Sequence, residues 1–369
     1  MAAAIRLGLV GYGTGGRYFH APFIEAADGV ELAGIVTRSA ARREAAAADY
    51  PGVPLFDSLA ELLASGVHAV AITTPPETRR ELVLEALTAG VHVVADKPFA
   101  PTAETGRELL RAAESAGVVL NAFHNRRWDT DLVTLRSVLD SGAIGDVARF
   151  ESRLDQDQPG SLDAGPGGGL LRDLGSHLVD QALWLFGPAV GVHAALEWTE
   201  LPAGRTDSGF ALTITHAGGV RSRLAGSKTH RLESRELRLL GSRGNYVSTY
   251  SDVQADAAIA GRRPAVDPQG WGYEEESRWG TLTTADGRVR VPSLQGAYQE
   301  YYRRFALAVF AGGEGPVPAR EAVHVLEVLD AARLSDAEDR VVHLPAEGQR
   351  SAGRAFRGTP RVVAPVELG

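Results

Sequence analysis

The chain has 369 residues, of which 44% are hydrophobic and 23% charged, as expected for a globular protein large enough for two domains. Its net charge of −8 argues against a nucleic-acid surface, which needs clustered Lys and Arg, and no apolar run approaches the length of a membrane span. Cysteine is absent, which excludes disulfides and cysteine-ligated zinc, so we expect a cytoplasmic protein with neither nucleic-acid nor membrane partners.

Strand-like and helix-like segments alternate through the first third of the chain. Strands are expected at residues 5–10, 30–37, 69–73, 91–95 and 118–122, and helices at 17–27, 40–49, 59–65, 78–89 and 103–116. Such alternation produces a parallel sheet that is covered by helices on both faces. We therefore predict a doubly wound α/β domain over residues 1–122.

The pattern changes after residue 122. Helices are expected at 129–141, 171–186, 298–311 and 319–336, and strands at 146–154, 210–215, 221–225 and 237–240, with a glycine-rich stretch at 159–169 and a loop at 264–280. The strands alternate polar and apolar residues, which is typical of an antiparallel or mixed sheet. Residues 123–369 are predicted to form a second domain, whose last residues can return to the first.

A glycine-rich turn joins the first strand to the first helix. Gly11, Gly13 and Gly16 have the G-x-G-x-x-G spacing, in which the glycines allow a tight turn, close approach of a pyrophosphate and close packing of helix on strand. The helix N-terminus then offers free N–H groups and a positive dipole end to the phosphates. The turn predicts a dinucleotide site, in which Tyr12 and Thr14 also bind the cofactor.

The end of the second strand is where NAD and NADP are distinguished. In NAD-binding proteins an acidic side chain here binds the ribose 2′-hydroxyl, whereas a basic one accommodates the 2′-phosphate of NADP. This chain has Thr37, Arg38 and Ser39 at that position and no carboxylate. Arg38 offers a planar fork suited to a phosphate, and the alternative is a solvated charge at a strand end. NADP is the predicted cofactor, with NAD as the alternative.

Lys97 lies between Asp96 and Pro98, directly after a predicted strand. Ligands of an open parallel sheet gather at the carboxyl ends of its strands, so Lys97 is expected at the mouth of the binding site. A lysine there can donate to a substrate hydroxyl. The alternative is an ordinary surface lysine beside an aspartate.

A second candidate set begins the helix that follows the glycine-rich stretch. Asp173 and His177 are four residues apart, which places them on one helical face, with Asp180 next along it. An aspartate one turn from a histidine can hold its imidazole for proton transfer near neutral pH. A structural His–Asp pair is the alternative. No metal site is expected, because the helix offers two candidate ligands without a clear third.

Together these segments resemble the Gfo/Idh/MocA oxidoreductase family, named for glucose–fructose oxidoreductase and inositol dehydrogenase. The resemblance covers nearly the whole chain and rests on the glycine turn, Thr-Pro-Pro at 74–76, Asp-Lys-Pro at 96–98, Gly-Gly-Gly-Leu-x-x-Asp-x-Gly-x-His-x-x-Asp at 167–180 and the helix at 318–336. It implies an N-terminal Rossmann fold with a doubly wound parallel sheet, and a C-terminal α/β domain with an open, mainly antiparallel sheet. The second domain would bind substrate and form a homodimer or homotetramer.

The resemblance also implies roles for particular residues. Lys97, Asp173 and His177 match the family's catalytic lysine, aspartate and histidine. Thr74, Pro75 and Asp96 join Lys97 among the residues expected to bind the cofactor. Two positions depart from the family pattern: Asp96 stands where a longer Glu is usual, and Arg79 stands near a position that often holds a histidine.

Residues 124–129, His-Asn-Arg-Arg-Trp-Asp, look most like the NADP-dependent branch that includes scyllo-inositol dehydrogenases. In that branch Asn125 and Arg126 would lie beside the nicotinamide and the substrate. Asp155, after the next predicted strand, is a further candidate for binding a substrate hydroxyl. His177 would contact substrate as well.

The working hypothesis is reversible oxidation of a secondary alcohol on a cyclic polyol or sugar. His177, oriented by Asp173, would take the hydroxyl proton, and Lys97 would stabilise charge on the same oxygen. Other functions of this fold are a non-catalytic sugar or nucleotide sensor that regulates transcription, an NAD-dependent glycosidase, and a reductase of a different carbonyl compound.

Overall fold

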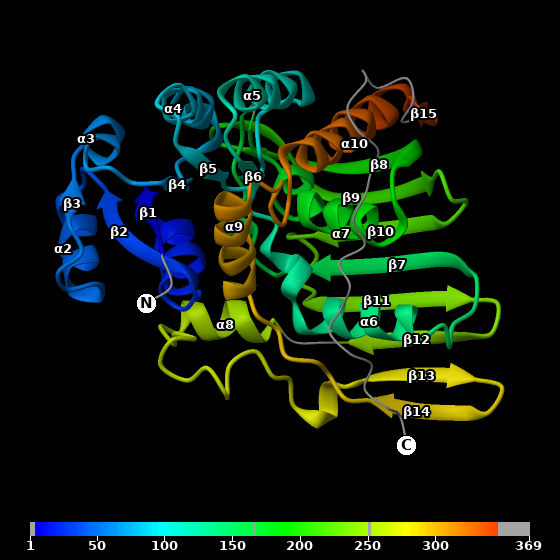
Figure 1. Cartoon of the computed structure of the whole chain (residues 1–369). Helices are drawn as coiled ribbons and strands as arrows, with labels where there is room; N and C mark the ends of the chain where they lie inside the picture. The colour runs from blue at the N-terminus through cyan, green and yellow to red at the C-terminus, as the bar shows by residue number, and fades with distance from the viewer. Residues whose placement is uncertain (1–3, 166, 250–251, 346–369) are drawn as a thin grey trace.

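Two β-sheets meet along a shared row of helices in the computed structural model, which describes residues 4–165, 167–249 and 252–345 (Figure 1). The first sheet has the strand order β3-β2-β1-β4-β5-β6 and is parallel throughout. The order reverses between β1 and β4, which is the switch point where doubly wound sheets bind ligands. The predicted Rossmann sheet is confirmed.

Apart from the short strand β3, which the sequence did not predict, the elements of the first sheet lie close to their predicted bounds. Its strands are β1 (Ile5–Val10), β2 (Val30–Val36), β3 (Leu55–Phe56), β4 (Ala69–Ile72), β5 (His92–Ala95) and β6 (Leu120–Ala122). Its helices are α1 (Ala21–Glu25), α2 (Ala40–Asp49), α3 (Leu59–Ala64), α4 (Pro76–Thr88) and α5 (Ala103–Ala116). A π-helical turn, Gly15–His20, precedes α1 where the sequence predicts a single α-helix.

The second sheet has the order β14-β13-β12-β11-β7-β10-β9-β8-β15. β7 and β10 run parallel and the other neighbours antiparallel, which confirms the predicted open, mainly antiparallel sheet. The strands are β7 (Val147–Asp155), β8 (Ala189–Leu201), β9 (Gly204–His216), β10 (Arg221–Ser227), β11 (Ser234–Gly241), β12 (Gly244–Thr249), β13 (Gly280–Thr284), β14 (Gly287–Val291) and β15 (Val342–His343).

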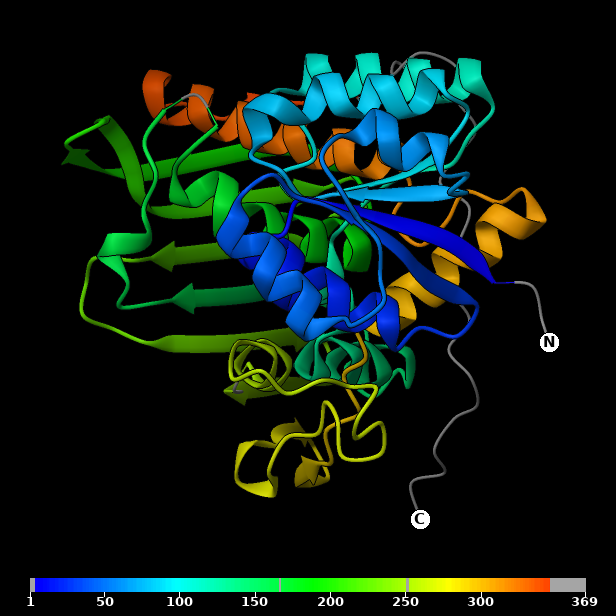
Figure 2. The same cartoon turned by 90° about the vertical axis from the view of Figure 1, so that its left-hand side faces the viewer.

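Three helices cover one face of this second sheet, namely α6 (Thr130–Asp140) on β12, α7 (Ser176–Phe186) on β10 and α10 (Ala319–Glu338) on β8 (Figures 1 and 2). Two further helices pack on the first part of the chain, α8 (Val253–Ile259) on the π-helical turn Gly15–His20 and α9 (Gln299–Ala311) on α1 and β2. Helix α10 joins the two sheets, because it also contacts α5 and β6.

Several elements of the second half escape the sequence prediction, among them β12 and β15. Strand β8 carries glycine and alanine that weaken its polar–apolar alternation, and α8 is a short helix without a clear apolar stripe. In the hairpin of β13 and β14 the second strand is mostly exposed and the first is largely half-buried, although Asp286-Gly287 at its turn is a hairpin signal. The final residues, 346–369, lie outside the described part of the chain.

Phe150 on β7 tests the packing of helix on sheet. Its side chain is fully buried and contacts the ring of Phe186 on α7, with 5.4 Å between ring centroids. Replacing a buried Phe with Ala removes apolar contact and leaves a cavity, so Phe150→Ala is expected to destabilise the fold by about 3–5 kcal/mol.

The measurement is the shift in denaturant-unfolding midpoint relative to the wild type. Val289→Ala on the exposed hairpin is the control, because 61% of its side chain is accessible and little packing is lost. Equal shifts for the two variants would contradict the role of Phe150 in the core.

Candidate active site

The glycine turn after β1 has the conformation that a dinucleotide site requires. Gly11 has a φ of +103°, which favours glycine, and a Cβ on Gly16 would stand 2.1 Å from the carbonyl oxygen of Gly11. Nothing lies within 4 Å of where a Cβ of Gly13 would be, so the turn leaves open space for a ligand beside its backbone. Thr14 is exposed on the turn, whereas Tyr12 is buried and its hydroxyl donates to Asp49.

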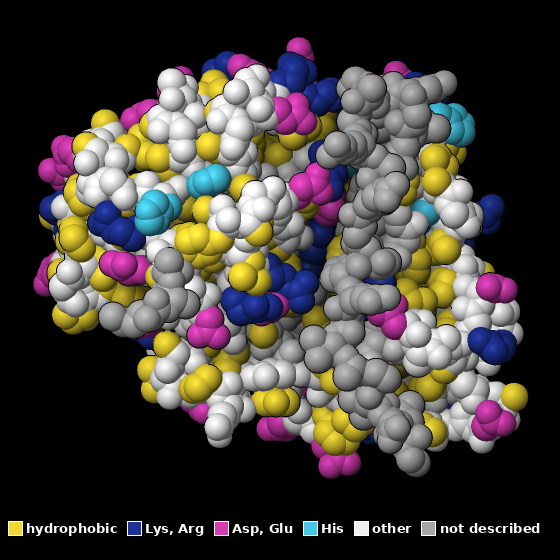
Figure 3. All heavy atoms as spheres, viewed as in Figure 1, with side chains coloured by type: hydrophobic (Ala, Val, Ile, Leu, Met, Phe, Trp, Pro, Cys, Tyr) yellow, Lys and Arg dark blue, Asp and Glu magenta, His cyan; other side chains and the backbone are white. Residues whose placement is uncertain are grey.

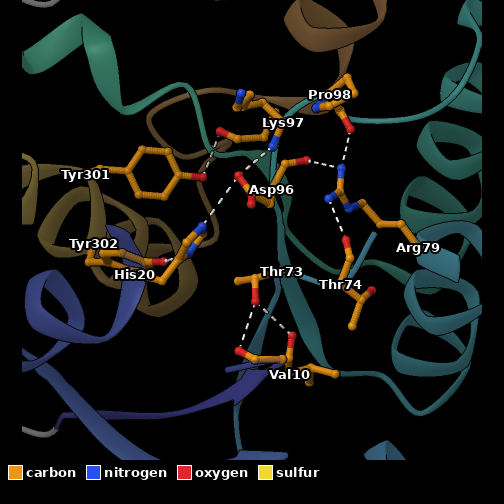
Figure 4. A network of polar contacts seen from close by, with 12 residues as sticks. Val10, His20, Thr73, Thr74, Arg79, Asp96, Lys97, Pro98, Tyr301 and Tyr302 are labelled. Carbon is orange, nitrogen blue, oxygen red and sulfur yellow. Dashed lines mark hydrogen bonds and ion pairs between the residues drawn. The ribbon is translucent and has the colours of Figure 1, made fainter. Parts of the chain in front are cut away.

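The end of β4 lies against this turn. Thr73 Oγ1 donates to the carbonyl oxygens of Val10 and Gly11, at 3.1 and 2.9 Å, which fixes the turn to the neighbouring strand (Figure 4). The hydroxyl of Thr74 is buried and has no hydrogen-bond partner among the described residues. A buried hydroxyl without a partner costs free energy, and a bound cofactor would supply the missing contact.

Arg79 links the ends of β4 and β5. It is buried in α4 and donates to the carbonyl oxygens of Thr74, Asp96 and Pro98 (Figure 4). The Lys97–Pro98 peptide bond between two of these acceptors is cis. The sequence marked Arg79 only as a departure from a family pattern, and its structural role needs contacts that the sequence does not show.

At the end of β2, Thr37 is buried while Arg38 and Ser39 are exposed. Arg38 forms no hydrogen bond or ion pair within the described part of the chain. Arg42, one turn into α2, is a second exposed cation that the sequence prediction did not single out. The carboxylate of Asp57, at the end of β3, is paired with Arg43 at 2.7 Å.

Asp96 faces the glycine turn and not outward. Its carboxylate accepts from the Lys97 backbone N–H at 2.7 Å, and its Oδ1 is 3.5 Å from Nε2 of the fully buried His20. The other ring nitrogen of His20 is 2.5 Å from the hydroxyl of Tyr302 on α9 (Figure 4). Burial raises the pKa of Asp96, but His20 and Arg79 outweigh it and lower the pKa to about 2.

Lys97 reaches from the first sheet to the π-helical turn Leu171–Gly175 that precedes α7. Its Nζ lies 2.5 Å from Oδ1 of Asp173 and 3.3 Å from the carbonyl oxygen of the same residue. Lys228, which the sequence analysis missed, donates to Oδ2 of Asp173 at 2.8 Å. Burial raises the pKa of Asp173, but the two lysines hold it well below the ordinary value of 3.8.

The predicted hydrogen bond between Asp173 and His177 is not formed. Both carboxylate oxygens accept from lysine ammonium groups, which make stronger, charge-assisted bonds than a neutral imidazole does. Nδ1 of His177 is buried without a partner among the described residues, and the ring meets that of His124 edge-on, with centroids 6.1 Å apart. Burial, reinforced by Lys97 and Arg126, lowers the pKa of His177 well below 6.5.

Arg126 lies in a buried ionic cluster next to His177. Its guanidinium contacts Asp129 at 3.0 Å and Asp252 at 2.8 Å, and Arg235 pairs with the same two carboxylates. The preceding residue, Asn125, is buried. Both terminal nitrogens of Arg126 are paired with carboxylates, so its guanidinium is held in one position.

Asp155 does not join this group of residues. Asp155 is buried at the end of β7, and its carboxylate pairs with the exposed Arg153. It forms no hydrogen bond or ion pair with Lys97, Asp173 or His177. The placement gives no support to the predicted contact of Asp155 with substrate.

In the ranges that the structure describes, no group of three or more His, Asp or Glu side chains has the arrangement of a metal site. No described helix is both long enough and apolar enough to cross a membrane. On the face shown in Figure 3, basic and acidic side chains lie interspersed.

Comparisons with known proteins agree with this architecture. Residues 5–124 match the model of an oxidoreductase family with an NAD-binding Rossmann fold, and residues 132–247 match a GFO/IDH/MocA C-terminal domain. The chain is 37% identical to the uncharacterized oxidoreductase YdgJ of Escherichia coli, over 89% of this chain and 96% of that protein.

A curated relative and a solved structure from Bacillus subtilis are also similar. The scyllo-inositol 2-dehydrogenase (NADP+) IolW is 32% identical over 92% of this chain and 96% of its own. The solved structure of the oxidoreductase yvaA superimposes with a TM-score of 0.85 at 32% identity, covering 94% of this chain and 99% of that one.

Asp173→Asn tests the charge balance of the two lysines. Because the folded-state pKa of Asp173 is below 3.8, its stabilisation is present in full above that value and is lost as the pH falls through the folded pKa. We expect the variant to be less stable near neutral pH by on the order of 1 kcal/mol, a figure that allows for solvent screening at a side chain that is 41% exposed.

The measurement is the denaturant midpoint of wild type and variant near neutral pH and again below the ordinary carboxyl pKa, where the difference should shrink. Asp140→Asn is the matched control, since its carboxylate is also 41% exposed but pairs only with Arg136 at the surface. A difference for Asp173→Asn that does not depend on pH would contradict the ionic explanation.

Proposed function

Because the chain belongs to the Gfo/Idh/MocA oxidoreductase family, we propose that it interconverts a secondary alcohol and a ketone on a cyclic polyol or sugar, with NADP(H) as cofactor. The observation that carries the proposal is the pairing of Lys97 with Asp173 beside a buried, uncharged His177. This pair stands at the carboxyl end of β5, next to the glycine turn. An ammonium donor and a neutral base at one place are what alcohol oxidation requires.

The described residues fit a dinucleotide. The backbone around Gly13 would hold the pyrophosphate, and the unpartnered Thr74 hydroxyl would donate to the cofactor. Arg38, with Ser39 and Arg42 nearby, would bind the 2′-phosphate of NADP. When bound, the nicotinamide supplies the redox chemistry, accepting a hydride from the carbon that bears the hydroxyl.

The residues of this chain would handle the proton and the charge. His177 has a low pKa, so its imidazole is neutral near pH 7 and can take the proton of the substrate hydroxyl. Lys97 would donate a hydrogen bond to the same oxygen and stabilise the negative charge that develops there. Asp173 keeps the Lys97 ammonium in place and would not orient the imidazole as the sequence suggested.

The substrate class and the subunit contact are inferred from relatives and from surface chemistry. IolW acts on scyllo-inositol with NADP+, and the similarity extends over nearly the whole of both chains. We infer a polyol or sugar for this chain on the same ground. The open face of the nine-stranded sheet, which carries Glu151, Arg223 and Arg238, is where we place the contact of a homodimer or homotetramer.

The first test is the nicotinamide absorbance during incubation with a panel of inositols, alditols and aldoses, with NADP+ and NAD+ offered separately. Turnover of a polyol with NADP+ is expected. Cofactor binding without turnover of any compound would overturn the proposal in favour of a sensor or of a reductase with a different substrate.

Lys97→Ala and His177→Ala test the proposed chemistry. Each is expected to lower kcat by roughly 10²–10⁴-fold, the usual effect of losing an acid–base or charge-stabilising group, while cofactor binding stays within a few-fold. In the wild type, kcat/KM should stay level as the pH falls through 6.5, because the pKa of His177 lies well below that value. Wild-type turnover by either variant would remove that residue from the mechanism.

Arg38→Ala tests the cofactor preference. Loss of a charge-assisted hydrogen bond to the 2′-phosphate is expected to raise KM for NADP+ by roughly 10–100-fold. KM for NAD+, which lacks that phosphate, should change little and serves as the internal control. The two cofactors losing affinity equally would argue that Arg38 supports the fold and not the phosphate.

A further inference from the structure

Lys228 lies outside the sequence motifs on which the family resemblance rests. It follows β10, and its backbone N–H donates to the carbonyl oxygen of Ser208 at 3.1 Å. Even-numbered residues of β10, such as Ser222 and Leu224, are buried under the helices, and Lys228 continues this side. Its side chain is 5% exposed and points to the same carboxylate as Lys97.

The Lys228 ammonium has more donors than the protein uses. An ammonium group carries three N–H donors, and within the described ranges Lys228 Nζ has one hydrogen-bond acceptor, Oδ2 of Asp173. Lys97 uses two of its donors, both toward Asp173. A nearly buried ammonium with two unused donors is costly unless a ligand supplies oxygen acceptors.

The charges around the two lysines do not cancel. Lys97 and Lys228 share the single negative charge of Asp173, which leaves one positive charge in excess. The adjoining cluster is balanced, because Arg126 and Arg235 face Asp129 and Asp252. His177 adds no charge near pH 7, since burial lowers its pKa.

Other nearby carboxylates are already engaged. Asp155 pairs with Arg153, Asp96 faces His20 and Arg79, and Asp180 pairs with Arg127. The surplus charge beside Lys97 is therefore left for a ligand to balance. One surplus charge matches a monoanion such as a carboxylate better than a dianionic phosphate.

We propose that Lys228 is a substrate-binding residue and that the preferred substrate is a polyol or sugar that bears a carboxylate. The carboxylate oxygens would accept the two unused N–H donors of Lys228 while the reacting hydroxyl lies at Lys97 and His177. The proposal rests on the proposed oxidoreductase function and narrows its substrate class.

The experiment compares acids with their neutral counterparts in wild type, Lys228→Met and Lys228→Arg. The pairs are D-gluconate with D-glucitol and D-glucuronate with D-glucose, each with NADP+, and the readout is the ratio of kcat/KM for acid over neutral compound. In the wild type the ratio should exceed about 10, and Lys228→Met should lower it by roughly 10–100-fold, the effect of one charge-assisted hydrogen bond.

Lys228→Arg keeps the charge and should retain most of the preference for acids. Arg111→Met is the control for removing one positive charge, because Arg111 is exposed on α5 away from the site, and its ratio should match the wild type. The ratio cancels any general loss of activity caused by a shift of Asp173. A wild-type ratio of one or less, or a ratio unchanged in Lys228→Met, would overturn the assignment of Lys228 while leaving the oxidoreductase function intact.

If no compound is turned over, the proposed function fails and binding decides the inference separately. Titration calorimetry of gluconate and glucuronate into the wild-type protein saturated with NADP+ should then show binding that Lys228→Met loses. Absence of acid binding to the wild type, or equal binding by both proteins, would overturn it.

Discussion

The ion pair between Lys97 and Asp173 is the contact on which the site depends, because Lys97 follows a strand of the first sheet and Asp173 precedes a helix that packs on the second. Lys97 is fixed by the end of β5, through the buried Arg79 and the carboxylate of Asp96. Asp173 belongs to the turn that begins α7, which packs on the second sheet. The pair therefore fixes the position of the carboxyl end of β5, in the first sheet, relative to helix α7, which packs on the second sheet.

Helix α9 reinforces the same junction through three buried tyrosines. Tyr298 donates to Asp129, Tyr301 to the carbonyl oxygen of Ala122 at 2.9 Å, and Tyr302 lies 2.5 Å from His20. Residues three and four apart share a helical face, so these tyrosines lie on one face at the start of α9. That face contacts the ionic cluster through Asp129, the end of β6 through Ala122, and the π-helical turn Gly15–His20 through His20. Burial of these hydroxyls is tolerated because each has a partner.

Most of the first sheet and the cofactor turn could be predicted from the sequence, because they depend on local patterns. Apolar strands alternate with helices there, and Gly11 and Gly16 are required by conformation and close packing within six residues. The position of Lys97 could be predicted because it follows a strand of a parallel sheet, and ligands bind at the carboxyl ends of such strands.

The rest depends on contacts between distant residues. Lys228 meets Asp173 across 55 positions, and His20 meets Tyr302 across 282. The sequence predicts one α-helix that carries both Asp173 and His177, whereas Asp173 lies in a π-helical turn ahead of α7. The lysine after β10 that binds Asp173 could not be inferred from the spacing of these two residues. In the hairpin of β13 and β14 the strands are polar apart from Leu282, Val289 and Val291, so they carry little apolar signal.

Both helices that bear site residues begin with a π-helical turn, Gly15–His20 before α1 and Leu171–Gly175 before α7. A π turn holds one more residue than an α turn, which makes it the structural counterpart of a single-residue insertion. The extra residue changes the direction in which side chains of the turn point, relative to the side chains of the α-helix that follows. Side chains such as Asp173 can be re-aimed by insertion or deletion of one residue, while the buried face of α7 keeps its register on the sheet. The same scaffold can in this way diversify its chemistry without repacking its core.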